Sequence, residues 1–174
     1  MLAFEQYADD SAGGDVARID GAITRAASGR PWTKAIVRDA EGVSSVLAID
    51  RYDVILIYPQ ALATDDQIAV ASIAMGRALT SFARAGGVVV VVDGSRGNSG
   101  TYPFANATGF LDVRGERSID GEAVQLTAPV DALAAGVATT YRAEPVSVAF
   151  DADAADAVYA WGAQPVVLHR AVVP

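Results

Sequence analysis

The sequence predicts a single α/β domain, residues 1–174, whose central sheet is mostly parallel. Strand-like apolar segments alternate with amphipathic helical segments through the first half of the chain, and this succession is typical of parallel sheets. Residues 88–92 are five consecutive valines, the composition of a strand buried on both faces. A glycine-rich polar loop, residues 93–100, follows at once. Ligands of open α/β sheets bind just beyond the carboxyl ends of such strands.

The first half of the chain predicts a β-α-β-α-β order with right-handed crossovers. A helix is expected from about Asp15 to Gly29, because apolar residues recur there at three- and four-residue spacing. A longer helix is expected after Thr64, whose hydroxyl can accept from the Gln67 amide in a capping box, and Gly86 ends it. The expected strands are residues 2–7, 34–39, 53–58 and 88–92, with a short helix or irregular crossover at 43–50.

After the glycine-rich loop the pattern changes, and little helix is expected. A short helix is predicted at 104–111 and one helical turn at 131–135. Short strands are predicted at 123–126, 146–150, 157–161 and 165–173. These strands should either extend the parallel sheet or add an antiparallel flap.

Composition excludes several classes of function. The net charge of −8 argues against nucleic acid or an anionic membrane as the main partner. The chain has no cysteine, so disulfides, thiolate metal sites and a cysteine nucleophile are excluded. No apolar run approaches the ~20 residues that span a bilayer, and the first residues do not resemble a signal peptide, so a cytoplasmic protein is expected. We predict no metal and no cofactor, with a small molecule or another protein as partner.

Four segments are informative together: residues 52–57, the helix end at 82–87 with the valines after it, 128–137 and 165–170. In this order they resemble the class I glutamine amidotransferase-like superfamily. The likeness covers roughly 53–170 and is greatest to the trehalose-utilisation-type domains and the related domain of β-galactosidase-like proteins. It implies a flavodoxin-like three-layer sandwich, with a mostly parallel central sheet and extra short strands in the C-terminal third.

The resemblance also implies where a reaction would sit and that it is missing. Active members carry a cysteine on a strained turn after the strand, which falls at 93–95 here, and a histidine from a later strand. This chain has no cysteine there and no histidine in 146–161. We therefore expect a non-catalytic domain that binds a small ligand or a partner protein at the carboxyl edge of its sheet. The expected ligand-binding residues are Tyr58, Gln60, Asp93, Gly94, Ser95 and Arg96.

Two alternatives are a serine hydrolase and a flavin-binding module. The hydrolase would use Ser95 with Asp93 or His169, although Asp93 stands where a G-x-S-x-G elbow needs glycine. His169 also fits a structural role in an apolar strand. The flavin module would hold the FMN phosphate on residues 11–14, but neighbouring aspartates repel a phosphate. Asp93 equally fits a cap of the turn that follows it.

Two weaker patterns complete the list of candidates. Asp151, Asp153 and Asp156 could coordinate calcium, but they lack the EF-hand glycine and glutamate, so a solvated acidic turn is favoured. The apolar last strand, residues 166–173, presents an edge that could pair with another copy. We therefore predict a homodimer.

Overall fold

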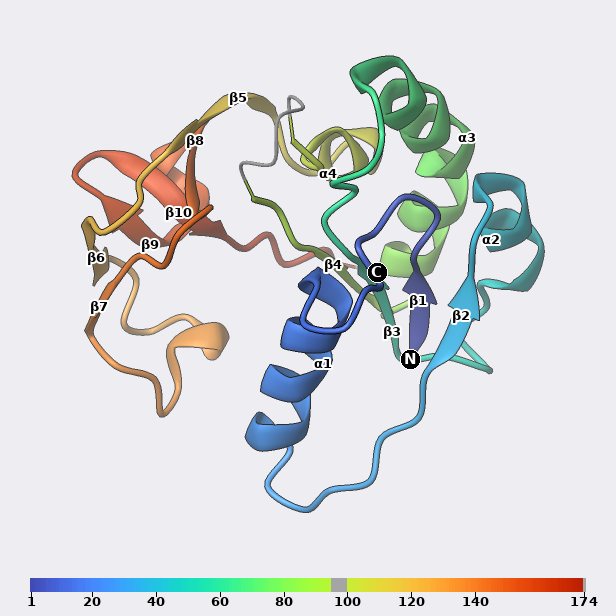
Figure 1. Ribbon diagram of the computed structural model, residues 1–174, viewed down its shortest axis with the longest axis horizontal. Helices are drawn as coiled ribbons and strands as arrows, with labels where there is room; N and C mark the ends of the chain where they lie inside the picture. The colour runs from blue at the N-terminus through green and yellow to red at the C-terminus, as the bar shows by residue number, and fades with distance from the viewer. Residues whose placement is uncertain (95–99, 174) are drawn as a thin grey trace.

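A parallel sheet forms the centre of the protein. A computed structural model describes residues 1–94 and 100–173. Four strands, in the order β2-β1-β3-β4, all run in one direction (Figure 1). Their bounds are Leu2–Phe4 for β1, Ala35–Val37 for β2, Val54–Ile57 for β3 and Val88–Val91 for β4. The predicted α/β class and its mostly parallel sheet are confirmed.

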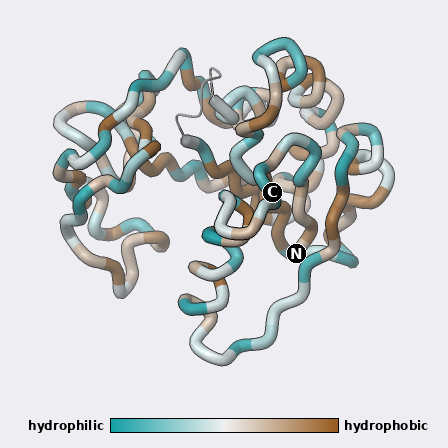
Figure 2. The backbone as a smooth tube through the Cα atoms, in the orientation of Figure 1, coloured by the Kyte–Doolittle hydropathy of each residue, from teal (hydrophilic) through white to brown (hydrophobic). Residues whose placement is uncertain are grey.

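Helices cover both faces of this sheet and make three layers (Figure 1). Successive strand residues point to opposite faces. Ala3 and Leu56 therefore pack on α1, and their neighbours Phe4 and Ile57 pack on the other helices. The helices are α1 (Asp15–Ala26), α2 (Ala40–Val46), α3 (Asp65–Arg84) and α4 (Pro103–Ala107). Figure 2 shows hydrophobic backbone segments at this sheet.

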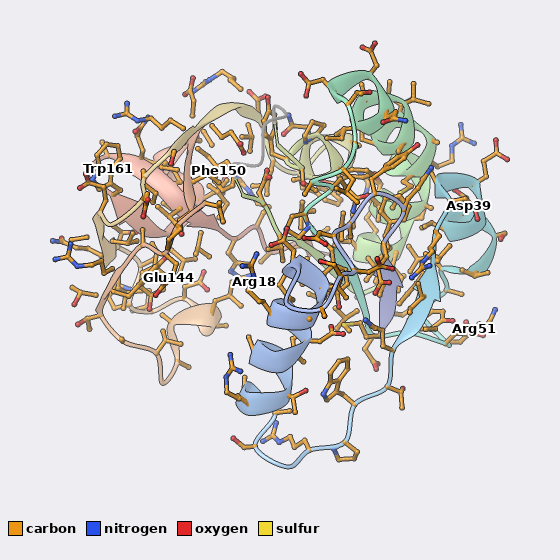
Figure 3. The ribbon with its side chains drawn as sticks, viewed as in Figure 1. Arg18, Asp39, Arg51, Glu144, Phe150 and Trp161 are labelled. Carbon is orange, nitrogen blue, oxygen red and sulfur yellow. The ribbon has the colours of Figure 1, made fainter. Side chains whose placement is uncertain are left out.

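Side-chain caps mark the starts of α2 and α3. Thr64 and Gln67 form the expected box: Thr64 Oγ1 accepts from the Gln67 amide at 3.3 Å, and Gln67 Oε1 accepts from the Thr64 amide at 2.9 Å. Helix α2 begins earlier than predicted because the Asp39 side chain, labelled in Figure 3, accepts from the amide of Gly42. Gly86, at φ +96°, ends α3 as expected.

The C-terminal third forms two antiparallel sheets, so the flap alternative is correct. One pairs β5 (Val113–Ser118) with β8 (Val148–Ala152), and the other has the order β10-β9-β6-β7. The latter strands are β6 (Ala123–Leu126), β7 (Thr140–Arg142), β9 (Ala157–Trp161) and β10 (Gln164–Leu168), with short 3-10 turns at Ala132–Ala134 and Ala154–Asp156. They enclose a separate cluster that includes Ile119, Val124, Val158 and Tyr159. Trp161 and Glu144 lie in this part (Figure 3).

One expectation about the valine strand was wrong. Within residues 1–94 and 100–173, β3 is the only strand that pairs with β4, so β4 lies at the sheet edge. Val88 is 52% exposed and Val90 is 36% exposed, instead of being buried on both faces. Valine favours a strand through its branched side chain, but it does not specify how many neighbours the strand has.

None of the helices in the part of the chain that the structure describes is both long and apolar enough to cross a bilayer.

Candidate functional site

Asp93 lies two residues after the end of β4, at the carboxyl edge of the parallel sheet. Its Oδ1 accepts from the backbone amides of Gly94 at 2.8 Å and Thr101 at 2.7 Å. Its Oδ2 accepts from the amide of Tyr102 at 2.7 Å. One carboxylate therefore holds both ends of the glycine-rich loop and Tyr102, the residue just before α4. This is the capping role that the sequence suggested as one of two interpretations of Asp93.

Glu116, on β5, brings a second carboxyl group to Asp93. Burial, then the negative charge of Asp93 and the hydrogen bond with it, raise the pKa of Glu116 to about 8. Burial also raises the pKa of Asp93, while the three backbone donors act in the opposite direction. Among the described residues, no donor reaches the buried Oε2 of Glu116. The proton of the pair therefore resides on Glu116, and the negative charge on Asp93.

Gly100 lets the backbone pass close to both carboxyl groups. Its φ is +94°, a conformation that residues with a side chain rarely adopt. A Cβ at this position would lie 2.6 Å from Cδ of Glu116 and 3.0 Å from Oδ2 of Asp93. Position 100 therefore requires glycine for two independent reasons.

Tyr58 and Gln60 belong to a network of buried hydrogen bonds that reaches Thr101, a neighbour of Asp93. Gln60 is fully buried: its Nε2 donates to the Tyr58 carbonyl at 2.7 Å, and its Oε1 accepts from the Tyr7 amide at 3.0 Å. The backbone amide of Gln60 donates to Oγ1 of Thr101 at 3.0 Å. The Thr101 backbone amide in turn donates to Asp93. The buried Tyr58 hydroxyl donates to Asp20, and burial followed by that hydrogen bond raises the pKa of Tyr58.

The remaining predicted residues lie in different places. Gly94 is buried, and a Cβ there would come within 3.1 Å of the Val146 carbonyl oxygen. Ser95 and Arg96 lie outside the described residues. His169 lies just after β10, where its Nδ1 is 2.7 Å from Oδ2 of Asp131. The hydrogen bond from His169 is the main cause of the lowered pKa of Asp131.

The three aspartates near η2 (Ala154–Asp156) have separate partners. Asp151 pairs with Arg114 at 2.5 Å, and Asp156 pairs with Arg170 at 2.6 Å. Asp153 caps the turn by accepting from the Ala155 amide at 2.9 Å. Each of the three carboxylates therefore has a partner of its own.

The loop that would hold a flavin phosphate is closed by a carboxylate. Oδ1 of Asp9 accepts from the Ser11 amide at 3.1 Å and from the Ser11 hydroxyl at 2.6 Å. Asp15, in the first turn of α1, pairs with Arg18 at 2.5 Å. Negative side chains therefore occupy donors that a phosphate would need.

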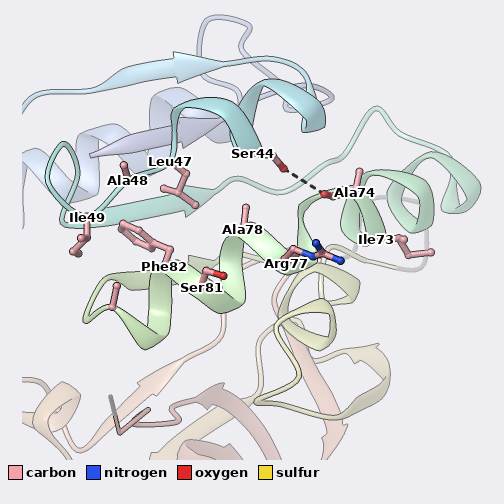
Figure 4. A pocket seen from close by; sticks show the side chains of 11 residues that line it. Ser44, Leu47, Ala48, Ile49, Ile73, Ala74, Arg77, Ala78, Ser81 and Phe82 are labelled. Atoms are coloured by element: carbon pink, nitrogen blue, oxygen red, sulfur yellow. Dashed lines mark hydrogen bonds between the residues drawn. The ribbon is translucent and has the colours of Figure 1, made fainter.

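Two pockets lie away from Asp93 and Glu116. One, of about 590 Å³, is a groove between α2 and α3 (Figure 4). The other, of about 560 Å³, lies between Phe110 and the C-terminal residues 170–173.

Glu116 was not foreseen from the sequence. It is one acid among the polar residues of β5, whose register with β8 brings it to Asp93. Neither periodicity nor a motif marks it. The glycine at position 100 was the only nearby signal, since a close backbone approach requires that residue type.

No family model matches this chain, and no curated protein matches it either. Among solved structures, it is similar to a crystal structure from Bacteroides uniformis that is described as ThuA-like. The identity is 13% and the TM-score is 0.49; the match covers 87% of this chain and 60% of the other. The chain thus spans three fifths of that protein's length, and no residue role transfers from the likeness.

Proposed function

We propose that this chain is a non-catalytic, amidotransferase-like domain that binds a small ligand at the Asp93–Glu116 carboxyl pair. One observation carries the proposal: two partly buried carboxyl groups converge on Gly100, at the carboxyl edge of a parallel sheet. That edge is where open α/β sheets bind ligands. The sequence segments that resemble the superfamily support the same location for the binding site.

The charge of the pair favours a ligand with hydroxyl or amino groups. Because the proton of Glu116 is donated in a hydrogen bond to Asp93, Glu116 offers a ligand a carboxyl oxygen that accepts a hydrogen bond from a hydroxyl or amino group. The Tyr102 hydroxyl is exposed to the electrostatic field of the same acidic groups. Burial is the main cause of its raised pKa, and Glu116, Asp93 and Asp65 add to it. The negative charges of Asp93 and Asp65 repel phosphates and carboxylates. A neutral polyol or an amine therefore fits better than an anion.

Binding is favoured over catalysis because the described groups are already engaged. Both oxygens of Asp93 accept backbone hydrogen bonds, so this carboxylate is already engaged in holding the loop. The Tyr58 hydroxyl donates to Asp20, and His169 contacts Asp131. The serine hydrolase depends on Ser95 and stays a prediction, as does the flavin module. In this proposal Tyr58 and Gln60 do not contact the ligand. They help to position Thr101, which binds Asp93.

The proposal is tested by titrating the ¹⁵N-labelled protein with sorbitol, ethanolamine and inorganic phosphate in separate series. Sorbitol or ethanolamine should give saturable shifts in the amide signals of Gly94, Thr101 and Tyr102, and phosphate should not. Glu116→Ala should abolish the shifts. Glu144→Gln, a change at an exposed acid of the antiparallel part, should leave them intact. No shift with either neutral or cationic probe, or shifts that survive Glu116→Ala, would contradict the proposal.

A further inference from the structure

An exposed stripe of four residues runs along α3. Asp66, Val70, Ile73 and Arg77 are spaced by four, three and four residues, so they share one face of the helix. Val70 is 70% exposed and Ile73 is 78% exposed, whereas the opposite face, which includes Met75, is buried against the sheet. Single exposed apolar residues are ordinary. Here two large ones are adjacent and lie between two opposite charges.

The groove between α2 and α3 extends this apolar surface. Ile73, Ala74 and Arg77 line it from α3, and Leu47 and Ile49 line it from the segment after α2. Figure 4 shows Ile73 and Arg77 toward one end of this groove. A side chain that extends past Ile73 from another molecule would enter an apolar recess instead of a flat surface.

The two charged residues of the stripe have no ion-pair partner among the described residues. Asp66 and Arg77 form no ion pair with any residue in 1–94 or 100–173. They are also too far apart to pair with each other, since eleven residues of helix span about 16 Å. Each is therefore available to a partner.

The stripe is complementary to itself when two helices run antiparallel. Asp66 precedes Val70 by four residues, and Arg77 follows Ile73 by four residues. A single register therefore brings Asp66 opposite the partner's Arg77 and Val70 opposite the partner's Ile73. By symmetry the same contacts form twice, as in an isologous two-fold interface. The exposed alanines 69 and 74 leave room for the helix axes to approach.

We propose that two copies of this chain form a symmetric dimer through antiparallel contact of their α3 helices. The contact lies on α3 and not on the C-terminal strand edge that the sequence suggested. A contact centred on one helix pair is at the small end of specific interfaces, so we expect a dissociation constant on the order of micromolar. Because two ion pairs flank the centre, salt should weaken the dimer.

Sedimentation equilibrium of the full chain, from micromolar to several hundred micromolar, tests the proposal. The wild type should dimerise. Asp66→Arg and Arg77→Asp should each weaken the dimer at least tenfold, because like charges then face each other. An equimolar mixture of the two variants should form heterodimers, and the double variant should form homodimers, since both restore opposite charges. Glu144→Arg, an equal charge change away from α3, should have no effect.

The outcomes separate this dimer from any other association. Each altered position is exposed, so circular dichroism should show the variants folded. A wild type that stays monomeric throughout the range overturns the proposal. So does a dimer that survives both single reversals, because its contact then lies elsewhere, for example at the last strand. Failure of the mixture to recover the dimer excludes the antiparallel register.

Discussion

Asp93 and Glu116 differ in what surrounds their oxygens, and this difference decides which of them carries the negative charge. Three backbone amides point at Asp93. Glu116 has mainly burial and the neighbouring charge, both of which favour its neutral form. The pair therefore closes a loop and also keeps one acidic proton in place at neutral pH.

This pair should make the fold less stable as the pH rises from about 4.5 to about 8. In the unfolded chain Glu116 loses its proton near 4.5, whereas in the folded chain it keeps it until about 8. The folded state binds more protons in this window, so the free energy of unfolding falls with pH. Because Glu116 is partly exposed to solvent, its pKa difference should contribute only on the order of 1–2 kcal/mol to the free energy of unfolding. Urea unfolding of the wild type, Glu116→Gln and Glu144→Gln at several pH values measures it.

Glu116→Gln should lose this part of the pH slope, because an amide resembles the neutral acid and does not titrate. Glu144→Gln should keep the slope of the wild type. Equal slopes in all three proteins would contradict the assignment of the proton to Glu116.

Gly100→Ala should destabilise the fold by roughly 2 kcal/mol or more, because it combines backbone strain with a collision against both carboxyl groups. Two controls separate these causes. Gly109→Ala has a similar φ of +74° but nothing within 4 Å, so it should show the strain alone. Gly115 has neither a positive φ nor a neighbour within 4 Å, so Gly115→Ala should hardly change the stability. Thermal unfolding of the three variants gives the comparison, and equal losses at positions 100 and 109 would mean that the collision is relieved.

At the scale of elements, regular segments could be predicted where local chemistry determines them. The start of α3 was expected from the Thr64–Gln67 box, and β6 and β9 have the predicted bounds. β5 and β7 were missed, since polar, exposed segments become strands only through pairing with β8 and β6. The edge position of β4 was missed for the same reason, because pairing partners distant in sequence decide it.

Thr64→Ala should cost about 1 kcal/mol of stability, because the Gln67 amide loses its acceptor at the start of α3. Thr64→Ser keeps a hydroxyl and should lose much less. Chemical unfolding of both variants measures the difference. A serine variant as unstable as the alanine variant would show that the methyl group, and not the cap, matters.

At the scale of the whole molecule, Asp93 and Glu116 connect the parallel sheet to the antiparallel part. Asp93 follows β4, and Glu116 belongs to β5. The close approach of Gly94 to the Val146 carbonyl adds a second connection. The two parts have separate apolar clusters, and these contacts are among those that connect them.

The single-domain prediction is tested with the two tryptophans. Trp32 precedes β2, whereas Trp161 ends β9 and stacks under Arg117 at 4.6 Å. Trp161→Phe leaves fluorescence that reports the parallel sheet, and Trp32→Phe leaves fluorescence that reports the antiparallel part. Within each variant, the fluorescence transition in urea should coincide with that measured by far-ultraviolet circular dichroism. Two separated transitions would show that the chain contains two cooperative units.

The open side of β4 has a consequence for handling the protein. An edge strand of valines presents backbone donors and acceptors to any extended chain that meets it, and natural sheets usually guard such margins with charge or proline. Among the described residues this margin is apolar, and Val88 and Val90 are 52% and 36% exposed. Prolonged storage at high concentration should therefore produce precipitates rich in intermolecular β-structure, visible as a low-frequency amide I band in the infrared spectrum.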